Sequence, residues 1–286
     1  METTPKIAVK DAADCGCDSS CCGRDAALMT PAETHALVRE KYTTAAHGEA
    51  CGCGCCAGPE GGVEALERLG YTAEQIATIP EGANLGLGCG SPLVHAQLKG
   101  GETVLDLGSG AGVDCFLAGR AVGERGHVIG VDMTPAMIDR ARANAARHGT
   151  TNVEFRLGEI ENLPVADASV DLVVSNCVIN LSPDKPRVFR EAYRVLKRGG
   201  TLLVSDLVLE RALSDTARRS AELYAGCVAG ASLESEYLDM ARAAGFHGLE
   251  AIDRRRYDVG ADHFAEGSEE RAAFASVVSL KLRAVK

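Results

Sequence analysis

The sequence contains no tryptophan, and it has only six phenylalanines and six tyrosines in 286 residues. A packed interior must therefore be built mainly from alanine, valine, leucine and isoleucine. No apolar run reaches the roughly 20 residues that a membrane-spanning helix needs, and the first residues lack the apolar segment of a secretory signal peptide. These absences predict a cytoplasmic protein that has no membrane partner.

Positive charge is also scarce, because 30 lysines and arginines stand against 40 aspartates and glutamates, for a net charge of -10. Proteins that bind nucleic acid normally present a basic face that neutralises phosphates. We therefore expect a small-molecule substrate and no nucleic-acid partner.

Cysteine, by contrast, is abundant, with twelve in the chain. Thiols stay reduced in the cytoplasm, so this number of cysteines in an enzyme-sized chain indicates thiolate chemistry or metal binding rather than a disulfide framework. They form two N-terminal clusters and four single positions: Cys15, Cys17, Cys21 and Cys22; Cys51, Cys53, Cys55 and Cys56; and Cys89, Cys115, Cys177 and Cys227.

The N-terminal part predicts little regular structure apart from one helix. Residues 1–29 have no periodic apolar face, and then Thr30, Pro31 and Glu33 provide a capping box with proline at the first helical position. The helix is expected to continue to about residue 46. A second capping box at Thr72 and Gln75 opens a short helix, and residues 84–92 are too rich in glycine for anything but a loop. We expect residues 1–60 to form a cysteine-rich extension.

From residue 102 onward, short apolar runs alternate with helical patterns. Such runs, apolar on both faces, are typical of a parallel sheet covered by helices. The sequence therefore predicts an α/β fold with a doubly wound, mostly parallel sheet over residues 61–212 and a smaller α+β substrate-binding region over residues 213–286. In residues 61–212 the expected strands are 103–107, 127–131, 153–157, 170–175 and 201–205. The expected helices of the same part are one that follows the first strand and ends at about residue 122, one over 134–148 and one over 185–196. In residues 213–286 helices are expected at 213–228 and 233–244, and strands at 251–259 and 274–282.

A glycine-rich motif, Asp106-Leu107-Gly108-Ser109-Gly110-Ala111-Gly112, lies where the first strand turns into a helix. Glycines permit a tight turn and a close approach of ligand to backbone, and ligands bind beyond the carboxyl ends of parallel strands. Asp132 closes the second strand, where a carboxylate can accept both hydroxyls of a ribose. The pair predicts a nucleoside cofactor. A dinucleotide site would have Gly-x-Gly-x-x-Gly, whereas here the third glycine comes one residue early.

Three single cysteines fall where loops can meet at the same edge of the sheet. Cys177 follows the fourth strand, Cys89 lies in the loop before the first strand, and Cys227 lies in the segment after the fifth. Three thiols gathered there would bind a soft metal or metalloid. Each cysteine alone is equally consistent with a small buried apolar residue, which is the interpretation we give to Cys115.

The pattern acid-x-Gly-x-Gly-x-Gly resembles motif I of the class I S-adenosylmethionine methyltransferases, which have a Rossmann-like fold. The resemblance implies S-adenosylmethionine as the cofactor, with Asp106 near its methionine end, Asp132 at the ribose and Asn176 near the transferred methyl group. The cofactor-binding residues that it implies are Asp106, Gly108, Ser109, Gly110, Asp132, Met133, Glu159, Ile160 and Asn176.

Longer strings resemble one family, the arsenite methyltransferases, over roughly residues 30–250. They are DLGSGAGVD at 106–114, SNCVINL at 175–181, and the Gly-Cys pairs that end at Cys89 and Cys227. The resemblance implies that Cys89, Cys177 and Cys227 are catalytic ligands of trivalent arsenic. It implies that Cys56 supplies a further thiol for substrate handling and disulfide relay. Animal and algal relatives carry tyrosine where this sequence has Leu87.

The same resemblance implies arsenite or its glutathione conjugate as the substrate and thioredoxin or glutathione as the reductant. Two alternatives remain open from the residues. One is a class I methyltransferase that acts on another small molecule, such as a quinone precursor. The other is a cysteine-rich metal-binding protein, although the N-terminal spacings are Cys-x-Cys and Cys-Cys rather than the Cys-x-x-Cys of structural zinc sites.

Overall fold

The computed structural model describes residues 29–48, 66–67, 71–87, 90–258 and 260–286. Both N-terminal cysteine clusters, and with them Cys56, lie outside the described residues, as does Cys89. The described residues therefore do not test the predictions made for these cysteines.

The described chain is built on one seven-stranded sheet with the strand order β3-β2-β1-β4-β5-β7-β6. Strands β1 to β5 are parallel, and β7 runs antiparallel between β5 and β6. The strands are β1 (Thr103–Leu107), β2 (His127–Asp132), β3 (Val153–Leu157), β4 (Val170–Asn176), β5 (Leu196–Leu209), β6 (His247–Arg256) and β7 (Val277–Val285). The chain reverses its direction across the sheet between β1 and β4, and such a switch point creates a crevice at the carboxyl ends of the strands.

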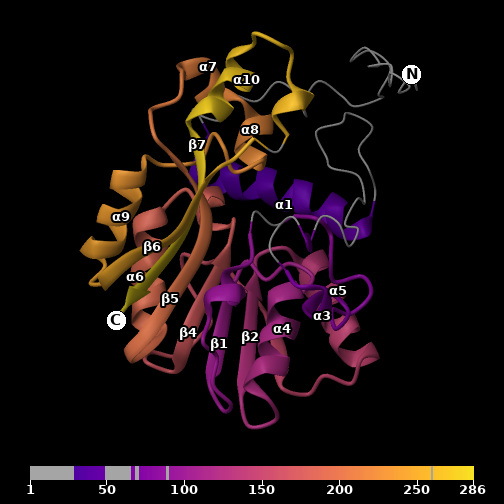
Figure 1. The fold of residues 1–286 in the computed structure, drawn as a ribbon. Coiled ribbons are helices and arrows are strands. Elements are labelled where there is room, and N and C mark those ends of the chain that lie inside the picture. The colour runs from indigo at the N-terminus through magenta and orange to yellow at the C-terminus, as the bar shows by residue number, and fades with distance from the viewer. Residues whose placement is uncertain (1–28, 49–65, 68–70, 88–89, 259) are drawn as a thin grey trace.

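Helices cover both faces of the sheet (Figure 1). Because side chains alternate along a strand, Leu105 packs with α6 and α9 while Val104 packs with α4 and α5. The helices are α1 (Pro31–His47), α3 (Ala73–Ile76), α4 (Val113–Val122), α5 (Pro135–Arg147), α6 (Lys185–Val195), α7 (Asp215–Arg219), α8 (Ala221–Ala225), α9 (Glu234–Ala243) and α10 (Glu269–Ala273). Short 3-10 turns are η3 (Pro92–His95), η4 (Ile179–Leu181), η5 (Ala261–His263) and η6 (Phe274–Ser276). The predicted doubly wound, mostly parallel fold is confirmed.

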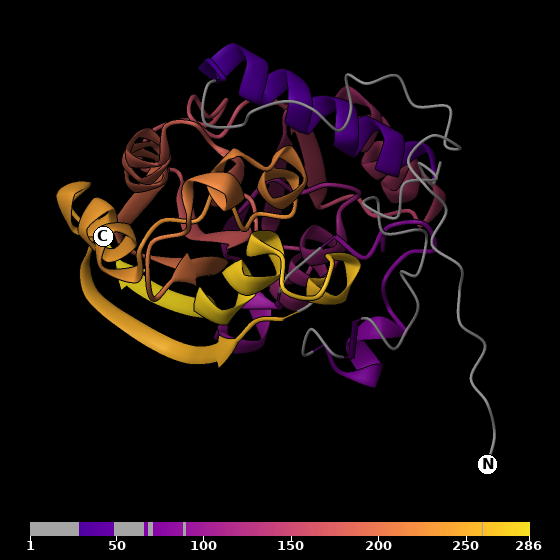
Figure 2. The ribbon, with the colours of Figure 1, turned by 90° about the horizontal axis from the view of Figure 1, so that it is seen from above.

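Helix α1 lies across the end of the sheet at which the parallel strands finish (Figures 1 and 2). It begins at the predicted capping box, in which the Thr30 hydroxyl accepts from the Glu33 backbone and the Glu33 carboxylate accepts from the Thr30 backbone. The buried Val38 of α1 belongs to a third core cluster, which also contains residues of β5, α7, α8 and β7. Residues far apart in the sequence thus converge on the carboxyl edge.

Several boundaries differ from the sequence predictions. Helix α6 ends at Val195, and β5 begins at the next residue instead of at residue 201, so Gly199 and Gly200 lie inside the strand. Strand β5 also continues to Leu209, because it pairs with the antiparallel β7 over its whole second half. The single helix expected over 213–228 is instead two short helices, α7 and α8, separated at Ser220.

Candidate active site

The glycine-rich turn leads from β1 into α4 with three glycines in the left-handed region, Gly108 (φ 66°), Gly110 (φ 52°) and Gly112 (φ 101°). A side chain at Gly108 would place its Cβ 2.4 Å from a methyl carbon of Val178, so this position accepts only glycine. A Cβ at Gly110 would meet no atom within 4 Å. The backbone at Gly110 therefore faces open space, and a ligand can approach it closely.

Asp132, at the end of β2, connects this turn to the next one. Its carboxylate accepts the Gly110 backbone N–H at 3.0 Å and the Thr134 backbone N–H at 2.8 Å. Burial raises the pKa of Asp132, while the two backbone donors oppose that rise. These hydrogen bonds fix the carboxylate at the switch point, between the two turns.

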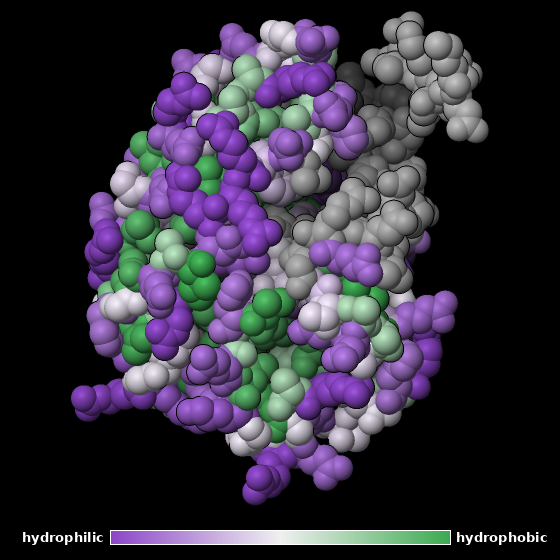
Figure 3. All heavy atoms as spheres, viewed as in Figure 1, coloured by the Kyte–Doolittle hydropathy of each residue, from purple (hydrophilic) through white to green (hydrophobic). Residues whose placement is uncertain are grey.

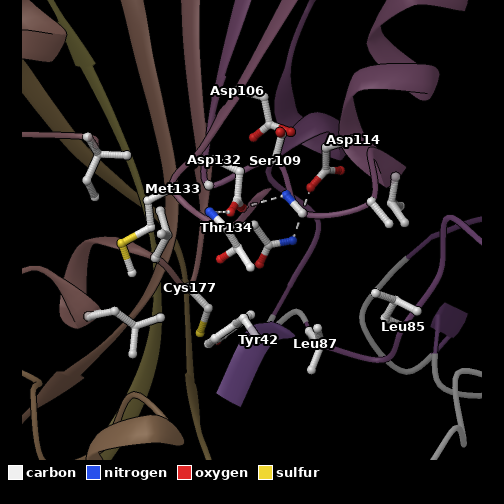
Figure 4. A pocket seen from close by; sticks show the side chains of 18 of the residues that line it. Tyr42, Leu85, Leu87, Asp106, Ser109, Asp114, Asp132, Met133, Thr134 and Cys177 are labelled. Carbon is white, nitrogen blue, oxygen red and sulfur yellow. Dashed lines mark hydrogen bonds between the residues drawn. The ribbon is translucent and has the colours of Figure 1, made fainter. Parts of the chain in front are cut away.

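A cavity opens between the turn, α1 and the segment that follows α3, with about 1070 Å³ of space outside the protein atoms, part of it open to solvent. Figure 4 shows its acidic side beside Asp106, Asp114 and Asp132, and a more apolar side beside Tyr42 and Leu87. Burial raises the pKa of Asp106 well above its usual range and that of Asp114 to about 6. Among the described lining residues there is no lysine or arginine. The cavity therefore suits a cationic ligand with an apolar portion and disfavours a pyrophosphate.

The residues predicted to bind the cofactor lie around this cavity, with one exception. Glu159 is not among the lining residues, since its carboxylate lies 3.5 Å from the His35 ring and 3.6 Å from the Arg39 guanidinium, both on α1. The others line the cavity: Asp106, Gly108, Ser109, Gly110, Asp132, Met133, Ile160 and Asn176. Contact with a cofactor remains a prediction for all nine.

Two of the predicted cysteines, Cys177 and Cys227, come into contact beside the cavity, although they are 50 residues apart in the sequence. The Cys227 thiol donates to the backbone carbonyl of Cys177 across 3.0 Å, and both residues are nearly fully buried. Cys177 lines the cavity and is disulfide-bonded. The predicted third thiol, Cys89, lies outside the described residues.

The backbone of these two cysteines is strained. Cys177 (φ 59°) and Cys227 (φ 65°) are two of the three described residues other than glycine with positive φ. Such conformations cost roughly 1–3 kcal/mol each and persist at functional sites where the surroundings impose them. Here the Cys177 amide donates to the Ser205 carbonyl at 2.8 Å and the Cys227 amide to the Tyr224 carbonyl at 2.9 Å. Both residues are thus anchored in this conformation by backbone hydrogen bonds, next to their mutual contact.

The charges around Cys227 act in opposite directions. Burial raises the pKa of the Cys227 thiol, and the carboxyl of Asp206 raises it further, while Lys41 and Lys185 lower it. Burial also lowers the pKa of both lysines. The Cys227 side chain is thus a protonated thiol near neutral pH, and a thiophilic ligand must displace its proton.

Asp206 in β5 is a buried carboxyl that accepts from the Asn180 amide at 2.8 Å and from the Tyr237 hydroxyl at 3.0 Å. Burial raises its pKa to about 7, and the Tyr237 and Asn180 donors together with Lys185 oppose the rise. The folded-state pKa lies above the ordinary 3.8. The stabilising contribution of the neutral form is therefore complete below about pH 4 and is lost as the pH rises through about 7.

An Asp206→Asn variant should remove this dependence, because the amide mimics the neutral acid with the same partners. We expect the difference in free energy of unfolding between wild type and variant to fall by on the order of 2 kcal/mol from pH 5 to pH 8. Urea unfolding of both proteins at the two pH values measures it. A difference that stays constant with pH would mean that Asp206 is ionised throughout.

Several polar side chains at the site were not predicted from the sequence. Tyr71 donates to Asp114 at 2.9 Å, and Glu161 accepts from the ring of His35 at 3.1 Å and from the Ser182 hydroxyl. Asp114 is readable as an acid in the first turn of α4. No local signal marks the residues contributed by α1, since their position depends on how that helix packs.

Most of the surface in the view of Figure 3 is hydrophilic, with scattered hydrophobic patches. None of the helices in the described part of the chain is long and apolar enough to span a membrane. Within residues 29–48, 66–67, 71–87, 90–258 and 260–286, no three His, Cys, Asp or Glu side chains are grouped as metal ligands.

Comparisons with known proteins agree with this geometry. Residues 98–245 match the family model described as a methyltransferase domain. The arsenite methyltransferase of Halobacterium salinarum is 46% identical over 266 residues, which cover 90% of this chain and 67% of that protein. The arsenite methyltransferase of Aquipseudomonas alcaligenes is 49% identical over 166 residues, which cover 56% of this chain and only 47% of that protein.

A solved structure resembles most of the fold. The crystal structure of CrArsM, an arsenic(III) S-adenosylmethionine methyltransferase from Chlamydomonas reinhardtii, matches with a TM-score of 0.62 and 36% identity, covering 78% of this chain and 73% of that chain. High identity along nearly the full chain, a matching domain model and a matching fold coincide with the contact between Cys227 and Cys177 beside the cavity. The chain therefore belongs to the arsenite methyltransferase family.

Proposed function

We propose that this protein transfers methyl groups from S-adenosylmethionine to trivalent arsenic held by its own thiolates. The observation that carries the proposal is the contact between Cys227 and Cys177 at the rim of the acidic cavity. A methyltransferase for a carbon or oxygen acceptor has no need of two strained, buried cysteines at that position. A metal-binding protein has no need of the cofactor cavity.

The cavity fits S-adenosylmethionine, a cationic ligand with an adenosine portion. When bound, this cofactor supplies an electrophilic methyl group on a sulfonium sulfur. Gly110 offers open backbone without a side chain, and Asp132 offers a carboxylate to the ribose hydroxyls. Asp106 would lie toward the methionine end of the cofactor, while Ile160 and Met133 would provide apolar surface for the base. For Glu159 a cofactor contact requires its side chain to leave Arg39.

The thiols suit the acceptor, because trivalent arsenic is soft and prefers thiolates to carboxylates or imidazoles. We assign Cys89, Cys177 and Cys227 as its three ligands. Arsenic with three thiolates keeps one lone pair, and that lone pair is the nucleophile. No general base is needed, since no proton leaves arsenic. The protein's contribution is then the alignment of the acceptor with the methyl group.

The electron balance requires a reductant. Addition of a methyl cation to the lone pair raises arsenic from the trivalent to the pentavalent state, and two electrons must return it. Two thiolates supply these electrons as they join in a disulfide, and we assign Cys56 to this relay. The disulfide at Cys177 supports such redox chemistry. Thioredoxin or glutathione would reduce the enzyme again, in the cytoplasm, where both act.

The division of labour along the chain is part of the same proposal. Residues 1–60 would handle arsenic and electrons, residues 61–212 the cofactor, and residues 213–286 would complete the acceptor site. Cys227, in the turn after α8, is one of the residues that join the last region to residues 61–212, through its contact with Cys177.

The direct test is incubation of the purified full chain with arsenite, S-adenosylmethionine and a thioredoxin or glutathione system. We expect methylated arsenic species, separated by chromatography and detected by arsenic-specific mass spectrometry, and none when the cofactor is omitted. Stoichiometric cofactor binding without any methylated arsenic would leave a methyltransferase of another acceptor. Metal bound as purified and lost on deletion of residues 1–57, without methyl transfer, would favour the metal-binding alternative.

A further inference from the structure

Two segments that carry proposed arsenic ligands lie against each other beside the cavity. The first, the Cys177 turn, comprises residues 177–181, from the end of β4 to the end of η4. The second, the Cys227 turn, comprises residues 224–230, from the last turn of α8 onward. The contact between the Cys227 thiol and the Cys177 carbonyl is one point at which they meet. Two further contacts join them, and neither involves a sulfur atom.

Tyr224 forms the first of these contacts. Its hydroxyl donates to the backbone carbonyl of Leu181 at 3.1 Å, across 43 residues of sequence. Burial raises the pKa of this hydroxyl, so it stays protonated and remains a donor near neutral pH. The Tyr224 backbone carbonyl also accepts the Cys227 amide at 2.9 Å. Tyr224 therefore connects the backbone of Cys227 to the end of the Cys177 turn.

Gly230, at the other end of the Cys227 turn, forms the second contact. A Cβ at this position would lie 2.2 Å from the backbone oxygen of Asn180, so the two backbones are in close contact and only glycine fits. The same Cβ would lie 3.2 Å from the Tyr224 ring. The Cys227 turn is thus held to the Cys177 turn at both of its ends.

The Cys177 turn is itself fixed to the sheet. The Asn180 side-chain amide donates to the Asp206 carboxyl at 2.8 Å and to the Leu207 carbonyl at 2.6 Å, both in β5. An amide nitrogen has two hydrogens, and these two bonds use both. Because the Cys177 turn is fixed in this way, the position of the Cys227 turn sets the separation of the two ligands.

We propose that Tyr224 and Gly230 are positioning residues of the acceptor site, which hold the Cys227 turn on the Cys177 turn so that the two cysteines form a preorganised pair of arsenic ligands. The inference rests on the proposed function, and it adds two residues that do not line the cofactor cavity. A preorganised pair loses less entropy when one arsenic atom bridges it. Loss of either contact should therefore weaken ligands that bind two thiols and leave cofactor binding unchanged.

The probe is a monoaryl arsenous acid, which exchanges its two hydroxyls for two thiols and releases two molecules of water. All variants are made in the full chain with serine at the eight N-terminal cysteines, and the protein is kept reduced by a thiol-free phosphine. The binding that Cys227→Ser removes defines the site. Calorimetric titration measures the affinities, and urea unfolding measures the free energy of unfolding of each variant.

For Tyr224→Phe we expect the affinity for the aryl arsenical to fall about 10-fold, the lower end of the range seen when hydrogen-bonding support of a metal ligand is removed. Gly230→Ala should lose at least as much, because its Cβ forces the two backbones apart. The affinity for S-adenosylmethionine should change by less than about 2-fold in both, which is under 0.5 kcal/mol. A purely structural role would lower the free energy of unfolding without changing the affinity of the folded protein.

Tyr193→Phe and Gly100→Ala are the matched controls. Tyr193, on α6, packs edge-to-face on Phe246 through its ring, which phenylalanine preserves. A Cβ at Gly100 would meet only the Val122 carbonyl, at an ordinary contact distance of 3.8 Å. Both controls should bind the arsenical and the cofactor with wild-type affinity.

Reference affinity for the arsenical in both Tyr224→Phe and Gly230→Ala would overturn the inference, and so would an equal loss of cofactor affinity. If Gly230→Ala does not fold, Tyr224→Phe decides alone, because it keeps the ring and removes one hydrogen bond. Arsenical binding that Cys227→Ser leaves unchanged would instead defeat the proposed set of arsenic ligands.

Discussion

Replacement of Cys227 by serine is expected to abolish arsenite methylation while the protein still folds and binds its cofactor. A hydroxyl does not replace a thiolate on arsenic, and the remaining ligands would hold the acceptor out of line with the methyl group. Since a misplacement of about 1 Å can cost 10²-fold in rate, we expect turnover to fall at least about 100-fold. The Cys177→Ser variant should behave in the same way, because it removes another of the three proposed arsenic ligands.

The same substitution at Cys115 is the matched control. Cys115 is fully buried in the core between α4 and the sheet, and its thiol donates to Asp106 at 3.3 Å, a bond that a serine hydroxyl can also make. Cys115→Ser should therefore bind and methylate arsenite as the wild type does. The measurements are product formation, bound arsenic per chain and cofactor affinity by calorimetry. Wild-type turnover in both Cys177→Ser and Cys227→Ser would reject the thiol site.

The second large effect is expected at Asp132. In the Asp132→Asn variant the side chain loses its charge and one acceptor, so the backbone bond from Gly110 and the bonds that we propose to the ribose hydroxyls should both be weakened. Two charge-assisted hydrogen bonds at roughly 1.5 kcal/mol each correspond to about a 100-fold loss in cofactor affinity. Calorimetric titration with S-adenosylmethionine measures this loss directly.

Asp139→Asn provides the comparison for this prediction. Asp139 is an exposed carboxylate on α5, seven residues further along the chain and outside the cofactor cavity. The Asp139→Asn variant should bind the cofactor with wild-type affinity. Both Asp132→Asn and Asp139→Asn should bind an aryl arsenical with wild-type affinity, because neither substitution changes a cysteine. An unchanged cofactor affinity in Asp132→Asn would place the ribose elsewhere in the cavity.

The local features of the site were predictable because their signals lie within a few residues of one another. The capping box at Thr30 and Glu33 and the strand–turn–helix around Gly108–Gly112 each follow from short-range sterics and hydrogen bonds. The position of the end of β4 at the crevice was predictable from one general rule, that the carboxyl ends of parallel strands lie at the same edge of the sheet. That rule was enough to bring Asp132 and Cys177 to the same cavity.

Features that depend on packing between distant segments were not predictable in the same way. The extension of β5 to Leu209 needs the antiparallel partner β7, which is formed near the end of the chain. The hydrogen bond from the Asn176 side-chain amide to the Gly90 carbonyl also requires a loop and a strand end to meet, and no residue near either one indicates this contact.

By itself, the sequence determined the order of strands and helices, the glycine turn and the acid at the end of β2, since each is encoded by neighbouring residues. Tertiary structure alone decided that α1 would lie over the cavity and that the Cys227 thiol would contact the Cys177 carbonyl. The physical reason is that apolar burial has no direction of its own. Which buried surfaces meet, and which side chains they carry together, is settled only when the whole chain packs.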